Sequence, residues 1–460
     1  MKAATSAACK ILDLRNEARA SRNPCGPSSS IDPNRPMTLP ASPTPRRLNE
    51  IWFLTSELEG ERASSFRQSR WCRIFMETGA SIGIFNVQGA FAISETHCRN
   101  DQEFSEFRRA SLAMSRPVAS VREGLLVGLL RWLKHHLLVD LYLPNVVRLV
   151  WRCHRKLQHR TACVAVMASS PPFSMAVAGA LLKHLHPDKV VLSVDMRDAW
   201  ALHDALGGWR PLKRSIERWV LRRADYVTTV SFGLAREFEV TYDIRVGVMY
   251  NVATHYLDVP PAPTVDLATL SPDVDAKRLK IAYTGSAPAG FYDSVALVGA
   301  VKLLREHHPD LADRVQMIFV GACDEIRREA QAQQTAPKDL VFVPMVPHAL
   351  ARSIQGSADA LLFLAYYGED NKGVVSTKLF EYLCLGQPVL PISLHADSDV
   401  DRLLMRYCGA SINVHSAQEI MLAIARTVRE GPAALPRLDD ASRVKELVDD
   451  YRRQARDVLG

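Results

Sequence analysis

V-V-S-T-K-L-F-E-Y-L-C-L-G-Q-P-V-L, from Val374 to Leu390, has the pattern of a loop, a short helix and a strand in succession. Four apolar residues have the spacing of a buried helical stripe, namely Leu379, Phe380, Leu383 and Cys384. Gly386 is expected to end the helix, and Pro388 precedes the apolar run Val389 to Ile392, which predicts a strand. This order of elements is typical of parallel α/β domains.

Two charged residues of this helix share a second face. Lys378 and Glu381 are three residues apart, close to the expected helix N-terminus. The free backbone amides around Ser376 and Thr377, together with a lysine, suit a diphosphate, and a carboxylate one turn later can accept two ribose hydroxyl hydrogens. The pattern therefore indicates a nucleotide-sugar site; the alternative is an ordinary solvated Lys–Glu pair on a helix surface.

K-L-F-E-Y-L followed by G-Q-P-V-L resembles the donor-binding helix of GT-B glycosyltransferases of the family-four type. The resemblance implies that Glu381 binds the nucleotide ribose and that sugar transfer retains anomeric configuration. It covers residues 48 to 460, strongly in the second half and loosely in the first. Relatives carry a second glutamate eight residues before Glu381, where this chain has Gly373, and Glu369 or Asp370 could take its place.

Composition bounds the class of protein. A chain of 460 residues with 47% hydrophobic content can bury large cores and suggests two or three domains. A net charge of +7 fits an anionic partner, but the scattered basic residues and the absence of a recognisable nucleic-acid-binding motif argue against nucleic acid. The nine widely spaced cysteines favour reduced thiols in a cytoplasmic protein over a disulfide framework or a structural zinc site.

Two segments bear on localisation. Residues 1–47 lack the apolar core of a signal peptide and predict a disordered tail. Gly124 to Leu143 mixes leucines with basic residues and is too interrupted to cross a membrane. It could lie at a membrane interface, which would make the protein peripheral on the inner face of the membrane, or it could pack on a sheet as an ordinary amphipathic helix.

Short apolar runs alternate with helical stretches from Glu50 onward, which indicates an α/β fold with parallel sheets. Strands are expected at 51–55, 82–87, 163–167, 190–194, 226–230, 247–250, 279–283, 315–320, 340–343 and 358–364. The proline-rich residues 257–277 are the expected linker between an acceptor-binding domain at 48–256 and a nucleotide-sugar-binding domain at 278–460 with a closing helix at 437–458. We therefore predict a GT-B architecture, two doubly wound Rossmann-like domains facing a cleft.

The first domain offers polar residues where expected strands end. Asp195, Arg197 and Asp198 follow one strand in a turn, R-D-A-W, that resembles a recurrent feature of bacterial family-four enzymes. A carboxylate there could orient an acceptor hydroxyl and Arg197 could hold a phosphate or sugar, or the arginine could simply pair with an aspartate to cap the loop. The acceptor-side candidates are completed by Ser169, Ser170 and Arg67. The serines could instead belong only to a helix start, and Arg67 could be solvent-exposed.

In the second domain Gly285 and Ser286 end a strand with small residues that could approach a phosphate closely. Relatives place an arginine and a lysine after this loop, whereas this chain continues A-P-A-G-F-Y-D. Either Lys378 carries more of the diphosphate's charge, or the activity is weaker or different. A group of three aspartates invites a metal-site interpretation, but we expect them to lie around a helix start near Val400 to Tyr407: Asp397, Asp399 and Asp401.

These features together predict a hexosyltransferase-type glycosyltransferase that uses a nucleotide-diphosphate sugar and a saccharide or lipid-linked acceptor in cell-surface polysaccharide assembly. The catalytic candidates are Lys378, Asp195 and Arg197. No catalytic metal and no cofactor besides the donor substrate are expected. Two alternatives remain open: a nucleotide-sugar epimerase of the same fold, and a non-catalytic protein that binds sugar nucleotides.

Overall fold

The computed structural model describes residues 50–55, 63–88, 92–114, 143–202, 209–251, 263–366 and 373–438, and six positions near the C-terminus, 445, 446, 449, 450, 452 and 453. Several sequence predictions lie outside these residues: the tail at 1–47, the segment 124–143 apart from its last residue, Glu369 and Asp370, and nearly all of the closing helix at 437–458.

The first sheet has seven strands in the order β3-β2-β1-β4-β5-β6-β7. Its strands are β1 (Glu50–Thr55), β2 (Ser81–Gln88), β3 (Ala92–Cys98), β4 (Val164–Ser170), β5 (Val190–Met196), β6 (Tyr226–Thr229) and β7 (Gly247–Val248). All neighbours pair in parallel except β3, which runs antiparallel to β2 at the edge. This arrangement confirms the predicted parallel α/β character, with carboxyl ends of successive strands at one edge.

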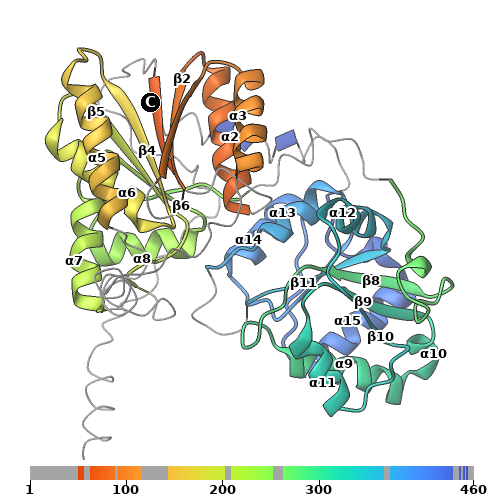
Figure 1. The fold of residues 1–460 in the computed structure, drawn as a ribbon. Helices are drawn as coiled ribbons and strands as arrows, with labels where there is room; N and C mark the ends of the chain where they lie inside the picture. The colour runs from red at the N-terminus through yellow and green to blue at the C-terminus, as the bar shows by residue number, and fades with distance from the viewer. Residues whose placement is uncertain are drawn as a thin grey trace, which may run out of the picture. The chain divides into compact units, whose positions relative to one another are not determined.

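Alternate side chains of β1 enter two hydrophobic layers on opposite faces of this sheet. Ile51 and Phe53 pack with residues of α2 and α3, whereas Trp52 and Leu54 pack with α5, α6 and α7. Figure 1 shows α2 and α3 grouped on one side of the strands and α5 and α6 on the other. The helices are α2 (Ala63–Glu77), α3 (Asp101–Met114), α5 (Leu143–Gln158), α6 (Phe173–Leu185), α7 (Arg210–Leu221) and α8 (Phe232–Tyr242).

The second sheet has five parallel strands in the order β10-β9-β8-β11-β12. Its strands are β8 (Leu279–Thr284), β9 (Val315–Val320), β10 (Leu340–Val343), β11 (Ala360–Leu364) and β12 (Val389–Ile392). The helices are α9 (Ser294–His307), α10 (Pro309–Ala312), α11 (Asp324–Ala332), α12 (His348–Ser357), α13 (Thr377–Cys384), α14 (Asp399–Cys408) and α15 (Ala417–Glu430), with short 3-10 turns η3 (Leu267–Thr269) and η5 (Pro432–Ala434). The order places β8 in the centre, as a doubly wound sheet requires.

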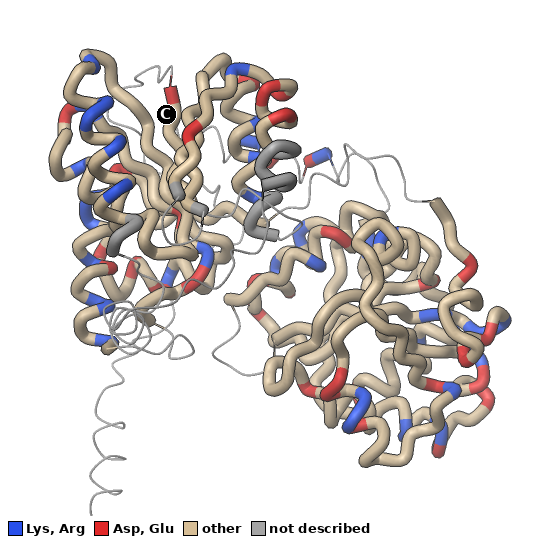
Figure 2. Tube along the Cα trace, in the orientation of Figure 1, with Lys and Arg blue, Asp and Glu red and all other residues tan. Residues whose placement is uncertain are grey.

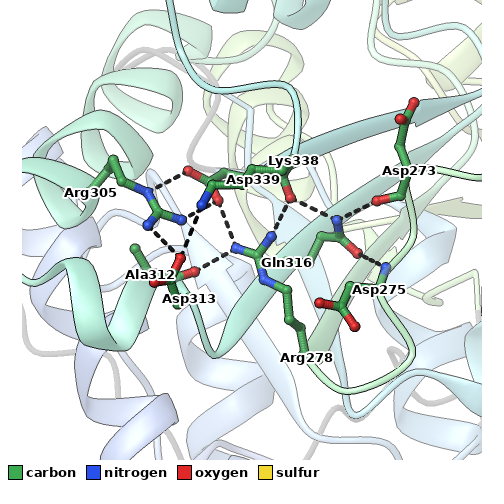
Figure 3. Close-up of polar contacts among 9 residues, drawn as sticks. All are labelled: Asp273, Asp275, Arg278, Arg305, Ala312, Asp313, Gln316, Lys338 and Asp339. Carbon is green, nitrogen blue, oxygen red and sulfur yellow. Dashed lines mark hydrogen bonds and ion pairs between the residues drawn. The ribbon is translucent and has the colours of Figure 1, made fainter.

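A buried network of ion pairs lies at the amino ends of strands β8 and β10 of the second sheet (Figure 3). The Asp339 carboxylate, 4% exposed, accepts hydrogen bonds from Arg278 at 2.6 Å and from Arg305 at 2.6 and 2.9 Å. Arg305 also pairs with Asp313, whose side chain is 60% exposed. Because two guanidinium groups converge on one buried carboxylate, Asp339 is the member whose loss leaves the most uncompensated charge.

Local predictions and structure differ in a few places. The strand expected at 163–167 extends through Ser170, so Ser169 and Ser170 belong to β4 rather than following it. The edge strand β3 was missed because A-I-S-E-T-H-C has few apolar residues for a strand pattern. The capping box that Ser416 and Glu419 predict is present at the start of α15. Among the described residues, no helix combines the length and the apolar content needed to cross a membrane.

Candidate functional site

The segment that decides the fold forms the predicted helix and strand. α13 begins after Ser376, whose side chain accepts a hydrogen bond from the Lys378 backbone N–H at 3.4 Å. Leu379, Phe380 and Leu383 are fully buried, which confirms the predicted stripe apart from the partly exposed Cys384. Gly386 has φ +67°, the left-handed conformation that a glycine after a helix end adopts most easily. α13 therefore presents Lys378 in its first turn.

The Lys378 side chain reaches across to the carboxyl end of β8. Its Nζ donates to the Tyr283 hydroxyl at 2.7 Å and to the Ser286 carbonyl at 3.3 Å, and it lies 4.4 Å from the centre of the Tyr283 ring. The Tyr283 hydroxyl in turn donates to the Ser286 carbonyl at 2.7 Å. The structure thus brings Lys378 together with the loop that the sequence predicted as its companion.

Gly285 is required at the point where this lysine crosses the loop. Its φ is +117°, and a Cβ at this position would lie 2.7 Å from Lys378 Cε and 2.8 Å from Nζ. A side chain at 285 would therefore strain the backbone and displace the ammonium. The small-residue loop after β8 leaves the Lys378 ammonium beside backbone atoms, which is the arrangement that a phosphate-binding loop needs.

The Lys378 ammonium has neutral hydrogen-bond acceptors. Burial lowers its pKa to about 8, and the Glu381 carboxylate and the Cys323 thiol oppose part of that fall. A phenol and a carbonyl oxygen offset the loss of water less well than a carboxylate or phosphate does. An anionic group placed here would raise the pKa of Lys378 and favour its charged form further.

Aromatic side chains stand where relatives carry a basic pair. Tyr366 lies two residues after the end of β11. Its ring centroid is 5.8 Å from that of Phe291 and 5.4 Å from that of Tyr292. Burial raises the pKa of Tyr292 well above its ordinary value, so this phenol is neutral near pH 7. Tyr283, Tyr292 and Tyr366 were not predicted as site residues. Tyr283 lies near the end of β8, Tyr292 lies between β8 and α9, and Tyr366 follows the end of β11.

Carboxyl ends of the first sheet hold a buried charged cluster. Arg67 and Asp195 form a two-point ion pair, with Nη2 to Oδ1 at 2.7 Å and Nε to Oδ2 at 3.0 Å, and each side chain is 2% exposed. Asp195 also accepts from Thr228 at 3.0 Å and from Ser169 at 3.3 Å. Four donors therefore fix this carboxylate, an arrangement suited to positioning the cluster.

Arg67 extends the cluster to the end of the sheet. Its Nη1 donates to the Met249 carbonyl at 2.7 Å, the Tyr250 carbonyl at 3.2 Å and Asn251 Oδ1 at 2.9 Å. The alternative that Arg67 is solvent-exposed is therefore wrong. Because Asp195 neutralises Arg67 and three further acceptors surround it, the charge of Arg67 is compensated by a direct ion pair, whereas the hydrogen-bond acceptors described for Lys378 are neutral.

The R-D-A-W turn packs against the first turn of α6. The Arg197 backbone N–H donates to the Ser170 carbonyl at 2.9 Å and its guanidinium donates to the Pro171 carbonyl. The Trp200 ring stacks on Phe173 at 3.9 Å between centroids. Ser170 is 2% exposed, whereas Asp198 is exposed. Arg197 thus anchors its turn to the end of β4, and Asp198 is the charged group of the turn that meets solvent.

The three aspartates lie around the start of α14, as expected. Ser398 caps the helix by accepting from the Asp401 N–H at 3.2 Å, and Asp401 accepts from the Asp397 N–H at 3.0 Å. Asp399 is 3% exposed and accepts from the Gly233 N–H at 2.8 Å; burial raises its pKa to about 6. Among the described residues, no group of three or more His, Cys, Asp or Glu side chains has the geometry to hold a metal ion.

Gly373 occupies the position where relatives carry their second glutamate. A Cβ there would lie 2.7 Å from the Gly233 Cα. A longer side chain at 373 cannot be accommodated without moving the backbone, which gives a packing reason for the departure from the family pattern.

Comparisons with solved structures show the fold. The chain matches an alpha,alpha-trehalose 6-phosphate synthase from Burkholderia multivorans with a TM-score of 0.54 and 9% identity, over 90% of this chain and 95% of that one. It also matches an E. coli structure titled as trehalose-6-phosphate bound with UDP-2-fluoro glucose (0.51, 9%, 89% and 96%) and the N-terminal domain of a Candida albicans trehalose-6-phosphate phosphatase (0.52, 11%, 90% and 98%). No family model and no curated protein sequence matches. With one mostly parallel sheet, one fully parallel sheet and these neighbours, the chain has the two-domain GT-B fold that the resemblance of the Val374 to Leu390 segment predicted.

Proposed function

We propose that this chain is a hexosyltransferase-type glycosyltransferase that moves a sugar from a nucleoside diphosphate donor to a saccharide or lipid-linked acceptor, with retention of configuration, in cell-surface polysaccharide assembly. The observation that carries the proposal is the Lys378 ammonium, partly buried beside the Gly285 loop and the N-terminus of α13. Within the described part of the chain it donates to two neutral oxygen atoms, the Tyr283 hydroxyl and the Ser286 carbonyl. Support for the donor class comes from the fold neighbour titled with UDP-2-fluoro glucose.

In this proposal the second sheet binds the donor. Lys378 and the amides near Ser376 and Thr377 contact the diphosphate, and Glu381 accepts hydrogen bonds from the ribose. As the bond between the sugar and the diphosphate breaks, negative charge grows on the leaving oxygen. The Lys378 ammonium stabilises that charge more in the transition state than in the ground state, which is the condition for catalysis.

The strand-end cluster of the first sheet is proposed to serve the acceptor. The Arg67–Asp195 pair is already saturated, so its role is to hold the carboxyl ends of β4, β5 and β6 in place. Asp198 is exposed in the R-D-A-W turn, and in this proposal its carboxylate orients the acceptor hydroxyl. Arg197 positions that turn through its contacts with Ser170 and Pro171.

The test is a thermal-shift screen with UDP-, GDP-, ADP- and TDP-sugars, followed by detection of nucleoside diphosphate release with the best donor. A ligand that binds only the native state raises the midpoint of unfolding. Lys378→Ala is expected to lower turnover more than donor affinity. Sugar interconversion without an acceptor would support the epimerase alternative, and tight donor binding without turnover would support a sensor. If no sugar nucleotide shifts the midpoint, the proposed donor site is wrong.

A further inference from the structure

Helix α5 presents an unusual outer face. Val147 and Trp151, one turn apart, are 65% and 57% exposed. Arg148, Arg152 and Arg155 are also exposed and have the spacing of one adjacent helical stripe. We call these five residues the α5 outer face.

The opposite side of α5 is an ordinary core face. Val146, Leu149, Cys153 and Leu157 are buried in the layer that covers the first sheet. The helix sequence L-P-N-V-V-R-L-V-W-R-C-H-R-K-L-Q contains no acidic residue. The apolar groups of the outer face are therefore additional to those that fold the protein, and no acid on this helix offsets its arginines.

Side-chain contacts hold this face in an ordered arrangement. The Arg155 guanidinium carbon lies 5.0 Å from the Trp151 ring centre, a cation–π distance. Arg152 donates to the Ile93 carbonyl of the edge strand β3 at 2.7 Å. Trp151 is thus flanked by cations while a large part of its ring remains open to solvent.

Helix α7, which like α5 packs on α6, continues the positive charge. Its exposed charged residues are Arg214 and Arg218, Arg222 follows directly after its end and is also exposed, and its acid, Glu217, is fully buried. Figure 2 shows Lys and Arg recurring along α5 and α7. The helices that cover this face of the first sheet therefore expose a basic layer, with Trp151 as its most accessible aromatic group on α5.

We propose that the α5 outer face binds the surface of a membrane that contains anionic lipid. Tryptophan prefers the interface between headgroups and acyl chains, an exposed valine gains by entering the same region, and the arginines pair with lipid phosphates. A polyanion such as RNA would use the arginines but would leave Val147 in water. The coexistence of the apolar stripe and the basic stripe therefore favours a bilayer over nucleic acid.

The proposal does not depend on the donor chemistry. It agrees with the basic, leucine-rich sequence 124–143, which leads directly into α5 and which the sequence predicted as a possible interfacial segment. It differs from that prediction because it assigns the contact to described residues of a folded helix. A membrane surface at this helix would serve a protein whose acceptor is lipid-linked.

Flotation of the full chain with vesicles tests the proposal. Vesicles of phosphatidylcholine containing roughly one third phosphatidylglycerol should carry the protein, and pure phosphatidylcholine vesicles should carry much less. Arg155→Gln should lower the partition coefficient about fivefold, because each basic residue near an anionic surface contributes on that scale. Trp151→Ser should lower it roughly tenfold, and this loss should persist at high salt because it is apolar in origin.

Matched controls lie on helices of the second sheet. Met405 is 52% exposed and the Arg426 side chain is 68% exposed, so Met405→Ser and Arg426→Gln remove the same kinds of group elsewhere. Both controls should float like the unmodified protein, and all four variants should keep their unfolding midpoint. Donor titration should be unchanged in Trp151→Ser, which separates this proposal from the donor site. Equal flotation of the α5 variants and the controls, absence of wild-type flotation, or binding to RNA without binding to vesicles would each overturn the proposal.

Discussion

Raising the pH from 7 to 9 should weaken donor binding by removing the proton from Lys378. In the unliganded protein its pKa is lowered to about 8, first by burial, with Glu381 opposing the change. Its hydrogen-bond acceptors, the Tyr283 hydroxyl and the Ser286 carbonyl, carry no net charge. A diphosphate bound beside the ammonium stabilises the charged form, so the pKa of Lys378 in the complex must be higher than in the free protein.

The magnitude follows from this difference in pKa. With a pKa of about 8, Lys378 is roughly 90% protonated at pH 7 and roughly 10% protonated at pH 9. Between the free and the bound pKa, donor binding must take up a proton, and affinity falls by up to about tenfold for each pH unit. We therefore expect about a tenfold weaker affinity at pH 9 than at pH 7, with proton uptake on binding rising from about 0.1 to about 0.9.

Calorimetric titration with the best donor at pH 7, 8 and 9 measures both quantities. Pairs of buffers with different ionisation enthalpies give the number of protons taken up. Lys378→Met serves as the baseline, because any titration of the nucleotide base appears equally in this variant, which should bind weakly and without proton uptake by residue 378. Equal pH dependence in the unmodified protein and Lys378→Met would refute the assignment of the ammonium to the diphosphate.

Three further predictions concern other charged groups. Glu381→Gln should lower donor affinity by about 1.5 to 3 kcal/mol in calorimetric titration without changing the unfolding midpoint, because a charged ribose acceptor is lost; unaltered affinity would contradict the ribose role. Asp339→Asn should lower the free energy of unfolding, measured in urea, by about 3 to 5 kcal/mol, because Arg278 loses its buried counter-ion. Asp313→Asn in the same network should lower it much less, because Asp313 is exposed. Similar losses in both variants would show that burial does not decide the effect. Burial raises the pKa of Glu217 to about 7 in the folded protein, so the unfolded chain releases this proton at lower pH. The free energy of unfolding should therefore fall by roughly 3 kcal/mol as the pH rises from 4.5 through 7. Urea titrations of Glu217→Gln should show a smaller dependence of stability on pH, and an unchanged dependence would assign it to other groups.

Local sequence patterns predicted much of the fold because apolar spacing and helix-ending residues act within one element of the chain. The apolar spacing from Leu379 to Leu383 and the glycine at 386 specify α13 and its end without knowledge of the partner strands. The same applies to the strands of the second sheet, which are continuous apolar runs because both of their faces are buried. The polar edge strand β3 carries no such record, since its outer edge and much of its surface are not in the core.

Partners distant in sequence could not be predicted in the same way. The sequence predicted that Lys378 and the Gly285 loop serve one site. It did not predict that the hydroxyl of Tyr283, 95 residues earlier, accepts a hydrogen bond from the Lys378 ammonium. Arg67 and Asp195 are 128 residues apart, and their pairing depends on β1 and β5 lying in one sheet with β4 between them. Residue types alone left Arg67 open to an exposed position; only the strand order brings a carboxylate within its reach.

The contrast between Arg67 and Lys378 separates a structural charge from a binding charge. Both side chains stand at carboxyl ends of parallel strands, where α/β folds bind ligands. Arg67 meets a carboxylate at two points and three further oxygen acceptors, so adding an anion would compete with bonds that already exist. Lys378 donates to a phenol and a carbonyl, and burial lowers its pKa to about 8 although the Glu381 carboxylate opposes part of that change. We therefore propose the diphosphate site at Lys378, where an anion would add a charged partner, rather than at the more completely hydrogen-bonded arginine.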